Sequence, residues 1–257
     1  MDPAATWAAL QDACPGISSS APALAGSLRE TVVEATLAQG IARLLGRVLQ
    51  PVWLSADGVV AMAELEFSRA PDLAAIVMED LATITDRNLE SGGIAWTWLG
   101  NRGFHVMATH RLIHSLWTGG HQETALALKA GLSPLGADIH PAVHFGRRIF
   151  LDHGVGVVMG ETATIGDDVS IWHGVTLGST LMQGGDRHPK VGPGAILGAG
   201  ATVLGNISVG EGAIVAAGSM VLRPVLPFTV VAGNPAVPKA GYRHPFAFGP
   251  KRSSEVQ

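Results

Sequence analysis

The chain has 257 residues, of which 47% are hydrophobic and 15% charged, and its formal net charge at pH 7 is −4. This length is enough for one large or two modest domains, and the charge balance argues against a nucleic-acid-binding surface of clustered Lys and Arg. The single cysteine, Cys14, excludes an intrachain disulfide and argues against a zinc site built from several cysteines. The sequence contains neither a recognisable signal peptide nor an apolar run of about 20 residues, so we expect a cytoplasmic protein without a membrane contact.

The first half, residues 1–135, predicts a helical oligomerisation domain. Apolar residues between Leu28 and Leu49 recur on one face of an amphipathic helix. Similar patterns occur in three further segments: Ala61 to Ala70, Leu73 to Ile84 and Gly103 to Trp117. The histidines of this half are expected to serve packing or the surface: His105, His110, His114 and His121.

The second half, residues 136–237, has an apolar period of six. The downstream series is Val191, Leu197, Val203, Val209, Val215 and Val221. The upstream series is Ile139, Phe145, Leu151 and Val157, followed after a two-residue slip by Ile165, Ile171 and Leu177. A period of six fits neither a helix nor simple alternation and is typical of a hexapeptide β-helix. The alternative is a glycine-rich β protein in which the regular spacing of these apolar residues is accidental. The predicted fold class is therefore α+β, and residues 238–257 form a C-terminal tail.

One interruption of the repeat predicts a functional loop. Leu177 and Val191 are separated by fourteen positions where six would continue the period. The extra residues lie within Gly178 to Lys190, a segment far more polar than the coils around it. An insertion in a repeat protein maps to a loop on one face, often the binding face.

Three polar motifs in this half suggest catalysis: ADIHP (Ala137 to Pro141), LDHG (Leu151 to Gly154) and GGDRHPK (Gly184 to Lys190). A histidine oriented by a carboxylate can act as a general base toward a hydroxyl. An arginine beside a histidine can hold a substrate carboxylate. Side chains of neighbouring residues in an extended chain point to opposite faces, so we expect adjacent Asp152 and His153 not to form a pair.

For the other histidines of this half a structural role is an open alternative. His140 and His144 fit corner positions of a coil, and His173 fits an interior position or a subunit contact.

These motifs resemble those of the serine O-acetyltransferases. The match runs from Ala137 to Gly178, through GGDRHPK, to AGNPA at Ala232 to Ala236. It extends weakly back to the segment GFHVMATHRLIHSLW, Gly103 to Trp117. Hexapeptide repeats alone indicate a broad acyltransferase superfamily, whereas the ordered set ADIHP, LDH, GETA and GGDRHPK is much more specific.

The resemblance implies a left-handed parallel β-helix that forms homotrimers, or dimers of trimers, with active sites between neighbouring subunits. It implies direct transfer of acetyl from acetyl-CoA to the hydroxyl of L-serine, giving O-acetyl-L-serine and CoA for cysteine biosynthesis. No metal is expected.

The resemblance also implies roles for individual residues. His153 is the expected general base, and Asp138 is expected to orient it. Asp152 is expected to contact the substrate ammonium. Arg187 and His188 are expected to hold the substrate carboxylate.

Further positions are carried over from the same resemblance. Glu161 lies in the GETA motif near the substrate, and backbone amides near Ser179 are placed to stabilise an oxyanion. Ala199 and Ala217 are expected to line the pantetheine arm of acetyl-CoA.

One departure from the family concerns the acceptor. An ungapped alignment puts Asn88 and Gly92 where the family carries the two acids of a DPAxD motif, and Asp86 or Glu90 would replace them only after a two-residue shift. The Asn88 carbonyl can accept a hydrogen bond but offers no charge to an ammonium. A second class of acceptor therefore stays open, such as homoserine or a specialised-metabolite precursor. Whether cysteine inhibits the enzyme by feedback also stays open.

Two other departures concern the donor and a partner protein. Ile214 replaces a lysine common near the CoA tail. The chain ends in Gln257, where many relatives end in an isoleucine that inserts into O-acetylserine sulfhydrylase, so we expect that complex to be disfavoured.

Two hypotheses from other functional classes have less support in the sequence. A non-enzymatic scaffold for cysteine synthesis is disfavoured by the intact Asp138, His153, Arg187 and His188. A zinc-dependent β-helix enzyme would use three histidines, and His140, His144 and His153 do not have an obvious spacing for that.

Overall fold

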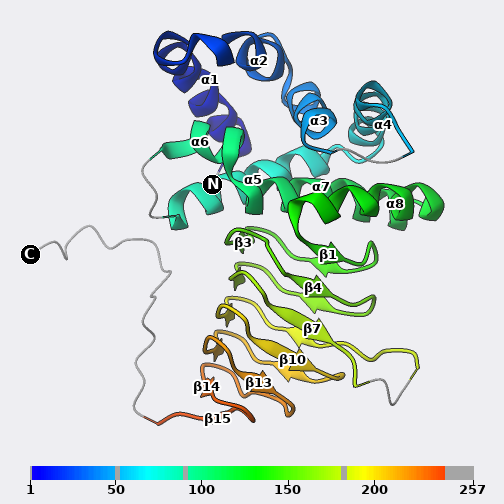
Figure 1. Cartoon of the computed structure of the whole chain (residues 1–257), viewed down its shortest axis with the longest axis vertical. Helices are drawn as coiled ribbons and strands as arrows, with labels where there is room; N and C mark the ends of the chain where they lie inside the picture. The colour runs from blue at the N-terminus through cyan, green and yellow to red at the C-terminus, as the bar shows by residue number, and fades with distance from the viewer. Residues whose placement is uncertain (1, 50–52, 89–91, 181–183, 241–257) are drawn as a thin grey trace, which may run out of the picture.

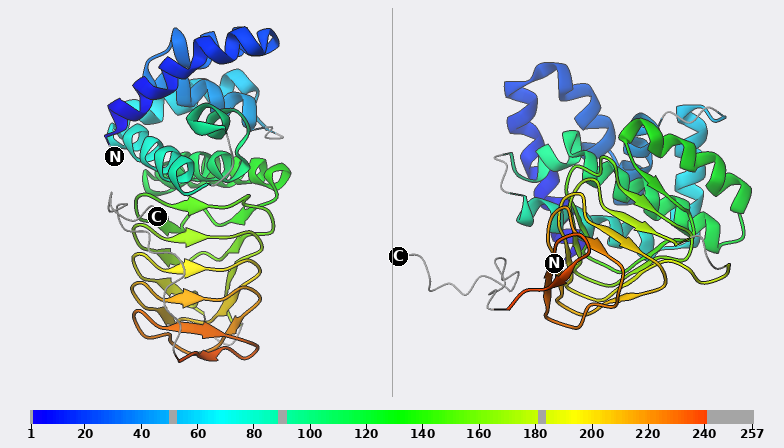
Figure 2. Two further views of the ribbon diagram at one scale, coloured as in Figure 1. Left: turned by 90° about the vertical axis from the view of Figure 1, so that its left-hand side faces the viewer. Right: turned by 60° about the horizontal axis from the view of Figure 1, so that its bottom comes forward.

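The computed structural model describes residues 2–49, 53–88, 92–180 and 184–240. Figure 1 shows helices at one end of a column of short strands, and Figure 2 shows the stacked coils of that column from two other sides. Across these ranges, no helix has the length and apolar character that a membrane crossing requires. Glu90 and Gln257 lie outside the described residues.

The helical half precedes the strand column in the chain. Its helices are α1 (Pro3–Ser20), α2 (Ala25–Leu28), α3 (Leu37–Val48), α4 (Ala56–Arg69), α5 (Asp72–Arg87), α6 (Gly93–Gly100), α7 (Arg102–Thr118) and α8 (Gln122–Lys129). Shorter helical turns are η1 (Pro22–Leu24), η2 (Arg29–Val33) and η3 (Ala130–Leu135). The predicted helical segments of residues 73–84 and 103–117 are confirmed within α5 and α7, and the predicted segment 61–70 is confirmed in α4 up to Arg69.

The predicted single helix from Leu28 to Leu49 is wrong, because the chain forms two elements there. The π-helical turn η2 ends at Val33, and α3 begins at Leu37. Thr36 starts α3 with a capping box: its Oγ1 accepts from the Gln39 N–H at 3.4 Å, and Gln39 Oε1 accepts from the Thr36 N–H at 3.1 Å. Apolar residues continue across this break, so their periodicity alone did not reveal it.

Three parallel sheets form the sides of the column. Sheet 1 contains β1 (Asp138–Ile139), β4 (Val158–Met159), β7 (Thr176–Gly178), β10 (Thr202–Leu204) and β13 (Met220–Val221). Sheet 2 contains β2 (His144–Phe145), β5 (Thr164–Ile165), β8 (Lys190–Val191) and β11 (Ser208–Val209). Sheet 3 contains β3 (Phe150–Leu151), β6 (Ser170–Ile171), β9 (Ile196–Leu197), β12 (Ile214–Val215), β14 (Val230–Ala232) and the antiparallel β15 (Val237–Pro238).

The six-residue period marks the interior of the column. Every member of the downstream series is the buried second residue of a two- or three-residue strand, from Val191 in β8 to Val221 in β13. One apolar side chain per strand fills the interior, and burying each contributes on the order of 1.5–3 kcal/mol.

The predicted position of the two-residue slip is wrong. The interior partner of Ile139 in the next coil is Met159, and not Val157. The two extra residues therefore precede Val157 and lie in the turn between β3 and β4. Val157 is itself fully buried, so its apolar character did not distinguish it from a strand position.

A buried ion pair fixes the helical layer to the first coil of the column. Arg111 of α7 donates from Nε to Asp80 Oδ2 of α5 at 2.8 Å and from Nη1 to the carbonyl of Phe145 at 2.8 Å. The other Asp80 oxygen accepts from the Ile149 N–H at 2.9 Å. Because each charged group finds its partners within the chain, this network fixes α5 and α7 against the first coil.

Candidate active site

The turns from sheet 3 to sheet 1 form one edge of the column, here called the His153 corner: residues 152–157, 172–175, 198–201 and 216–219. The first turn has six residues where the others have four. His153 lies in this longer turn with a left-handed φ of 58°, and its side chain is 59% exposed. The LDHG motif is therefore a widened corner that projects a histidine into solvent.

The expectation that Asp152 and His153 point apart is wrong. Asp152 Oδ1 lies 3.5 Å from His153 Nε2. The alternation rule holds only for extended backbone, and the left-handed φ of His153 turns the chain so that the two side chains converge.

His173 is the residue of this cluster for which no catalytic role was expected from the sequence. It occupies the turn of the next coil, its Nδ1 lies 3.9 Å from Asp152 Oδ2, and its ring centroid lies 5.9 Å from that of His153. Asp152 thus lies between two imidazoles. The coil register could have identified His173 from the sequence, because it places residues 152–157 and 172–175 one above the other.

Asp138 opens β1, where it pairs in register with Val158 of the coil below. Its Oδ1 lies 2.7 Å from Lys129 Nζ of α8. The structure does not bring Asp138 into contact with His153, and Asp152 is the carboxylate next to that imidazole. An orienting role for Asp138 stays a prediction.

A polar pocket of about 470 Å³ opens at the His153 corner. Its lining residues are Trp96, Gly100, Asn101, Arg102, His153, Val155 and His173. The helical half supplies four of them, from the end of α6 and the start of α7. The pocket therefore combines a candidate base, a second imidazole, a cation and an indole.

Asn88 and Gly92, the two positions that depart from the DPAxD motif, lie shortly before the pocket residue Trp96 in the sequence. Asn88 caps the C-terminus of α5, and the preceding Arg87 donates from Nη1 to Ser170 Oγ of β6 at 3.0 Å. Gly92 precedes α6, and a Cβ there would lie 2.5 Å from the Cβ of Trp96. An aspartate at position 92 would collide with Trp96 in this position. The position of the indole in the pocket therefore depends on the glycine at residue 92.

An apolar groove of about 500 Å³ runs along sheet 3 beside the His153 corner. Its lining residues are Trp172, Ile196, Gly198, Ala199, Ile214, Val215, Ala216, Ala217, Val230, Ala232 and Lys239. The predicted pair Ala199 and Ala217 is thus in one groove, together with Ile214. Lys239 is the one charged residue among the described lining residues, and its N–H donates to the Val230 carbonyl at 2.8 Å.

The turns from sheet 1 to sheet 2 form a different edge, here called the Arg187 corner: residues 140–143, 160–163, 179–189 and 205–207. Arg187 Nη2 donates to Glu161 Oε2 at 2.9 Å. This bond lowers the pKa of Glu161. Ser179 begins the long turn, of which residues 181–183 lie outside the described ranges.

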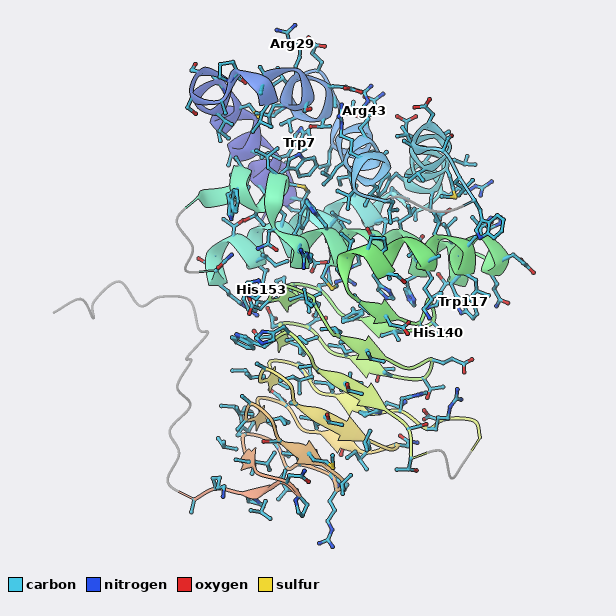
Figure 3. The ribbon with its side chains drawn as sticks, in the orientation of Figure 1. Trp7, Arg29, Arg43, Trp117, His140 and His153 are labelled. Carbon is cyan, nitrogen blue, oxygen red and sulfur yellow. The ribbon has the colours of Figure 1, made fainter. Side chains whose placement is uncertain are left out.

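Histidines mark both edges in Figure 3, where His153 lies at one edge and His140 at another. The His140 ring lies against Trp117 at the Arg187 corner, 5.2 Å between centroids. Burial lowers the pKa of His140. Within one chain, sheet 1 therefore separates Arg187 and His188 from Asp152 and His153.

The described part of the chain contains no group of three or more His, Cys, Asp or Glu side chains arranged to hold a metal ion.

Comparisons with known proteins identify related chains. A family model described as "Serine acetyltransferase, N-terminal" matches residues 6–109, and one described as "Bacterial transferase hexapeptide (six repeats)" matches residues 188–223. The serine acetyltransferase of Escherichia coli K12 is 37% identical over 217 residues, 84% of this chain and 80% of the relative. Serine acetyltransferase 2 of Arabidopsis thaliana is 48% identical over 161 residues, 62% of this chain, and this chain spans only 50% of that relative.

Solved structures show the same architecture. Soybean serine acetyltransferase complexed with serine has a TM-score of 0.87 at 40% identity, covering 91% of this chain and 97% of that one. Serine acetyltransferase from Brucella abortus strain S19 in complex with coenzyme A has a TM-score of 0.86 at 36% identity, covering 93% and 95%. These likenesses confirm the predicted fold class, a helical region followed by a left-handed β-helix.

Proposed function

Because the chain belongs to the serine acetyltransferase family, we propose that it transfers acetyl from acetyl-CoA to the hydroxyl of L-serine, giving O-acetyl-L-serine and CoA. The observation that carries this proposal is the position of the polar pocket around His153 directly beside the apolar groove. Trp172 lines the groove and the next residue, His173, lines the pocket. A donor lying in the groove would thus present its thioester to an acceptor held near His153.

The groove suits the donor. Ala199 and Ala217 have small side chains that leave room for a pantetheine arm, and Ile214 adds apolar surface where the family carries a lysine. Lys239, brought back to the groove by the β14–β15 hairpin, supplies a cation for the phosphates of acetyl-CoA. The Brucella relative was solved with coenzyme A, which supports a donor site in this fold.

The pocket suits proton transfer from a hydroxyl. In the proposed reaction His153 removes the hydroxyl proton as the oxygen attacks the thioester carbonyl, and it returns the proton to the sulfur when the C–S bond breaks. Backbone amides near Ser179 stabilise the oxyanion. Asp152, 3.5 Å from His153 Nε2, favours the imidazolium during the transfer and offers a charge to the ammonium of serine.

The site requires more than one copy of the chain. Arg187 and His188, the proposed partners of the substrate carboxylate, lie on a different edge from His153. An amino acid is too small to reach both edges across sheet 1 of one column. We infer a homotrimer, or a dimer of trimers, in which the Arg187 corner of one copy faces the His153 corner of the next. The exposed apolar side chains of Val155 and Val158, 41% and 43% accessible, support such a contact.

The test of this function is a panel of acceptors assayed with acetyl-CoA by thiol release. L-Serine is expected to give the highest kcat/KM. The specific observation in favour of a second acceptor is Gly92 with Trp96, because an indole replaces a carboxylate beside the pocket. A higher kcat/KM for L-homoserine than for L-serine would establish that second acceptor and refute the first.

A further inference from the structure

Thr162, the third residue of the GETA motif, is the centre of the hydrogen bonds that hold Arg187 and His188. Its hydroxyl oxygen accepts from the Arg187 N–H at 3.0 Å and from the His188 N–H at 3.1 Å. Its carbonyl accepts from the Lys190 ammonium. Through these bonds one side chain and one carbonyl fix the path of residues 187–190 beside the turn between β4 and β5.

The same residue also determines the protonation of the His188 ring. The Thr162 N–H points at His188 Nδ1, 3.2 Å away. A backbone amide can only donate, so Nδ1 must accept with its lone pair and carries no proton. The Thr162 hydroxyl proton has two acceptors within reach, His188 Nδ1 at 2.9 Å and the Asp186 carboxylate, and either choice leaves Nδ1 as an acceptor.

The proton of the neutral ring is therefore on Nε2. The His188 side chain is buried, at 6% exposure. Its Nε2 has no hydrogen-bond partner among the described residues, yet it is not one of their buried unpaired atoms, so it keeps contact with solvent. Gly160 makes this ring position possible, since a Cβ there would lie 1.9 Å from Nε2.

We propose that Thr162 is a positioning residue that fixes His188 as the Nε2–H tautomer, so that the ring donates a hydrogen bond to the carboxylate of the acceptor amino acid. This inference rests on the proposed function for the identity of the ligand, but the tautomer itself does not. Burial and the nearby Arg187 and Lys190 lower the pKa of His188, which is consistent with a neutral ring.

The first test measures the tautomer in the unliganded wild-type protein. Nitrogen-15 NMR of histidine-labelled protein, with the His188 signals assigned by their loss in His188→Gln, is expected to show an unprotonated Nδ1 and a protonated Nε2. A protonated Nδ1, or an equal mixture of tautomers, would overturn the proposal. This measurement needs no activity, so it stands apart from a failure of the proposed function.

The second test compares Thr162→Val with Thr162→Ser and with Thr164→Val. Loss of the hydroxyl removes the acceptor of two amides, and we expect the KM for L-serine to rise by at least about tenfold, while the KM for acetyl-CoA changes by less than about twofold. Thr162→Ser should restore the wild-type KM. Thr164 of β5 is the matched control, because its hydroxyl makes no hydrogen bond within the described structure, and its valine variant should behave as wild type.

A merely structural role for Thr162 gives a different pattern. In that case Thr162→Val would lower the melting temperature and raise the KM values for L-serine and acetyl-CoA together, which would overturn the proposal. If the wild-type protein acetylates no amino acid, the proposed function fails, and the tautomer measurement still decides the role of Thr162.

Discussion

Trp172 and His173, consecutive in the chain, line two different cavities, the apolar groove and the polar pocket of His153. Both residues lie in the turn from sheet 3 to sheet 1, residues 172–175, and each lines a cavity on a different side of that turn. The proposed donor and acceptor sites therefore share one corner of the column. The two substrates would meet at the turn of residues 172–175.

The first prediction concerns the general base. Replacement of His153 by alanine should lower kcat with L-serine by about 10²–10⁴-fold, the usual contribution of a positioned general base. Acetyl-CoA should still bind, because the groove is intact, and isothermal titration calorimetry measures that binding. A kcat within about threefold of wild type would contradict the assignment, since an effect that small is far below the general-base range.

The second prediction concerns Lys239 as the cation of the donor groove. Lys239→Ala should raise the KM for acetyl-CoA several-fold, with an effect that shrinks as salt rises, because screening weakens the attraction between lysine and phosphate. The KM for S-acetylpantetheine, which lacks the nucleotide, should stay the same. Arg223→Ala is the matched control, since Arg223 is also near the C-terminal end of the column but does not line the groove. Equal effects of the two variants would exclude a specific role for Lys239.

The third prediction concerns stability at acid pH. Burial lowers the pKa of His110 to about 3, and its Nε2 donates to the Val143 carbonyl at 2.9 Å. The unfolded chain binds this proton near pH 6.5 and the folded chain does not, so folding becomes less favourable as pH falls from about 6.5 toward about 3.

For that histidine the loss should reach about 1.4 kcal/mol per pH unit below pH 6. Urea unfolding of wild type and His110→Gln between pH 7 and pH 4.5 measures it, with the glutamine variant lacking this part of the slope. Parallel pH profiles for the two proteins would show that His110 does not remain neutral in the folded state.

Much of the fold was predictable from the sequence because one strand of a β-helix buries one apolar residue per side, which produces the period of six. The lengths of the turns were not predictable in the same way. Val157 is as apolar and as buried as a strand residue, so the period did not show that it belongs to the longer turn between β3 and β4. The left-handed φ of His153 was equally hidden, and with it the approach of Asp152.

The residue types of the candidate site were predictable from the sequence, but the edge of the column on which each residue lies was not. The motifs identified Asp152, His153, Arg187 and His188, but a sequence does not state which edge of the column each turn occupies. The pocket residues Trp96 and Arg102 were missed, because a helix carries them and only the packing of α6 and α7 over the first coil brings them to His153. The close approach of Trp96 to Gly92 likewise became visible only in the structure.

The central claim is that the active site forms between copies of the chain, and subunit complementation tests it most directly. His153→Ala and Arg187→Ala should each be nearly inactive alone. Co-expressed and randomly mixed, they should recover about a quarter of wild-type activity, because one site in four then combines an intact His153 with an intact Arg187 of its neighbour. No recovery, in mixtures shown by mass spectrometry to contain both variants in one assembly, would contradict the claim.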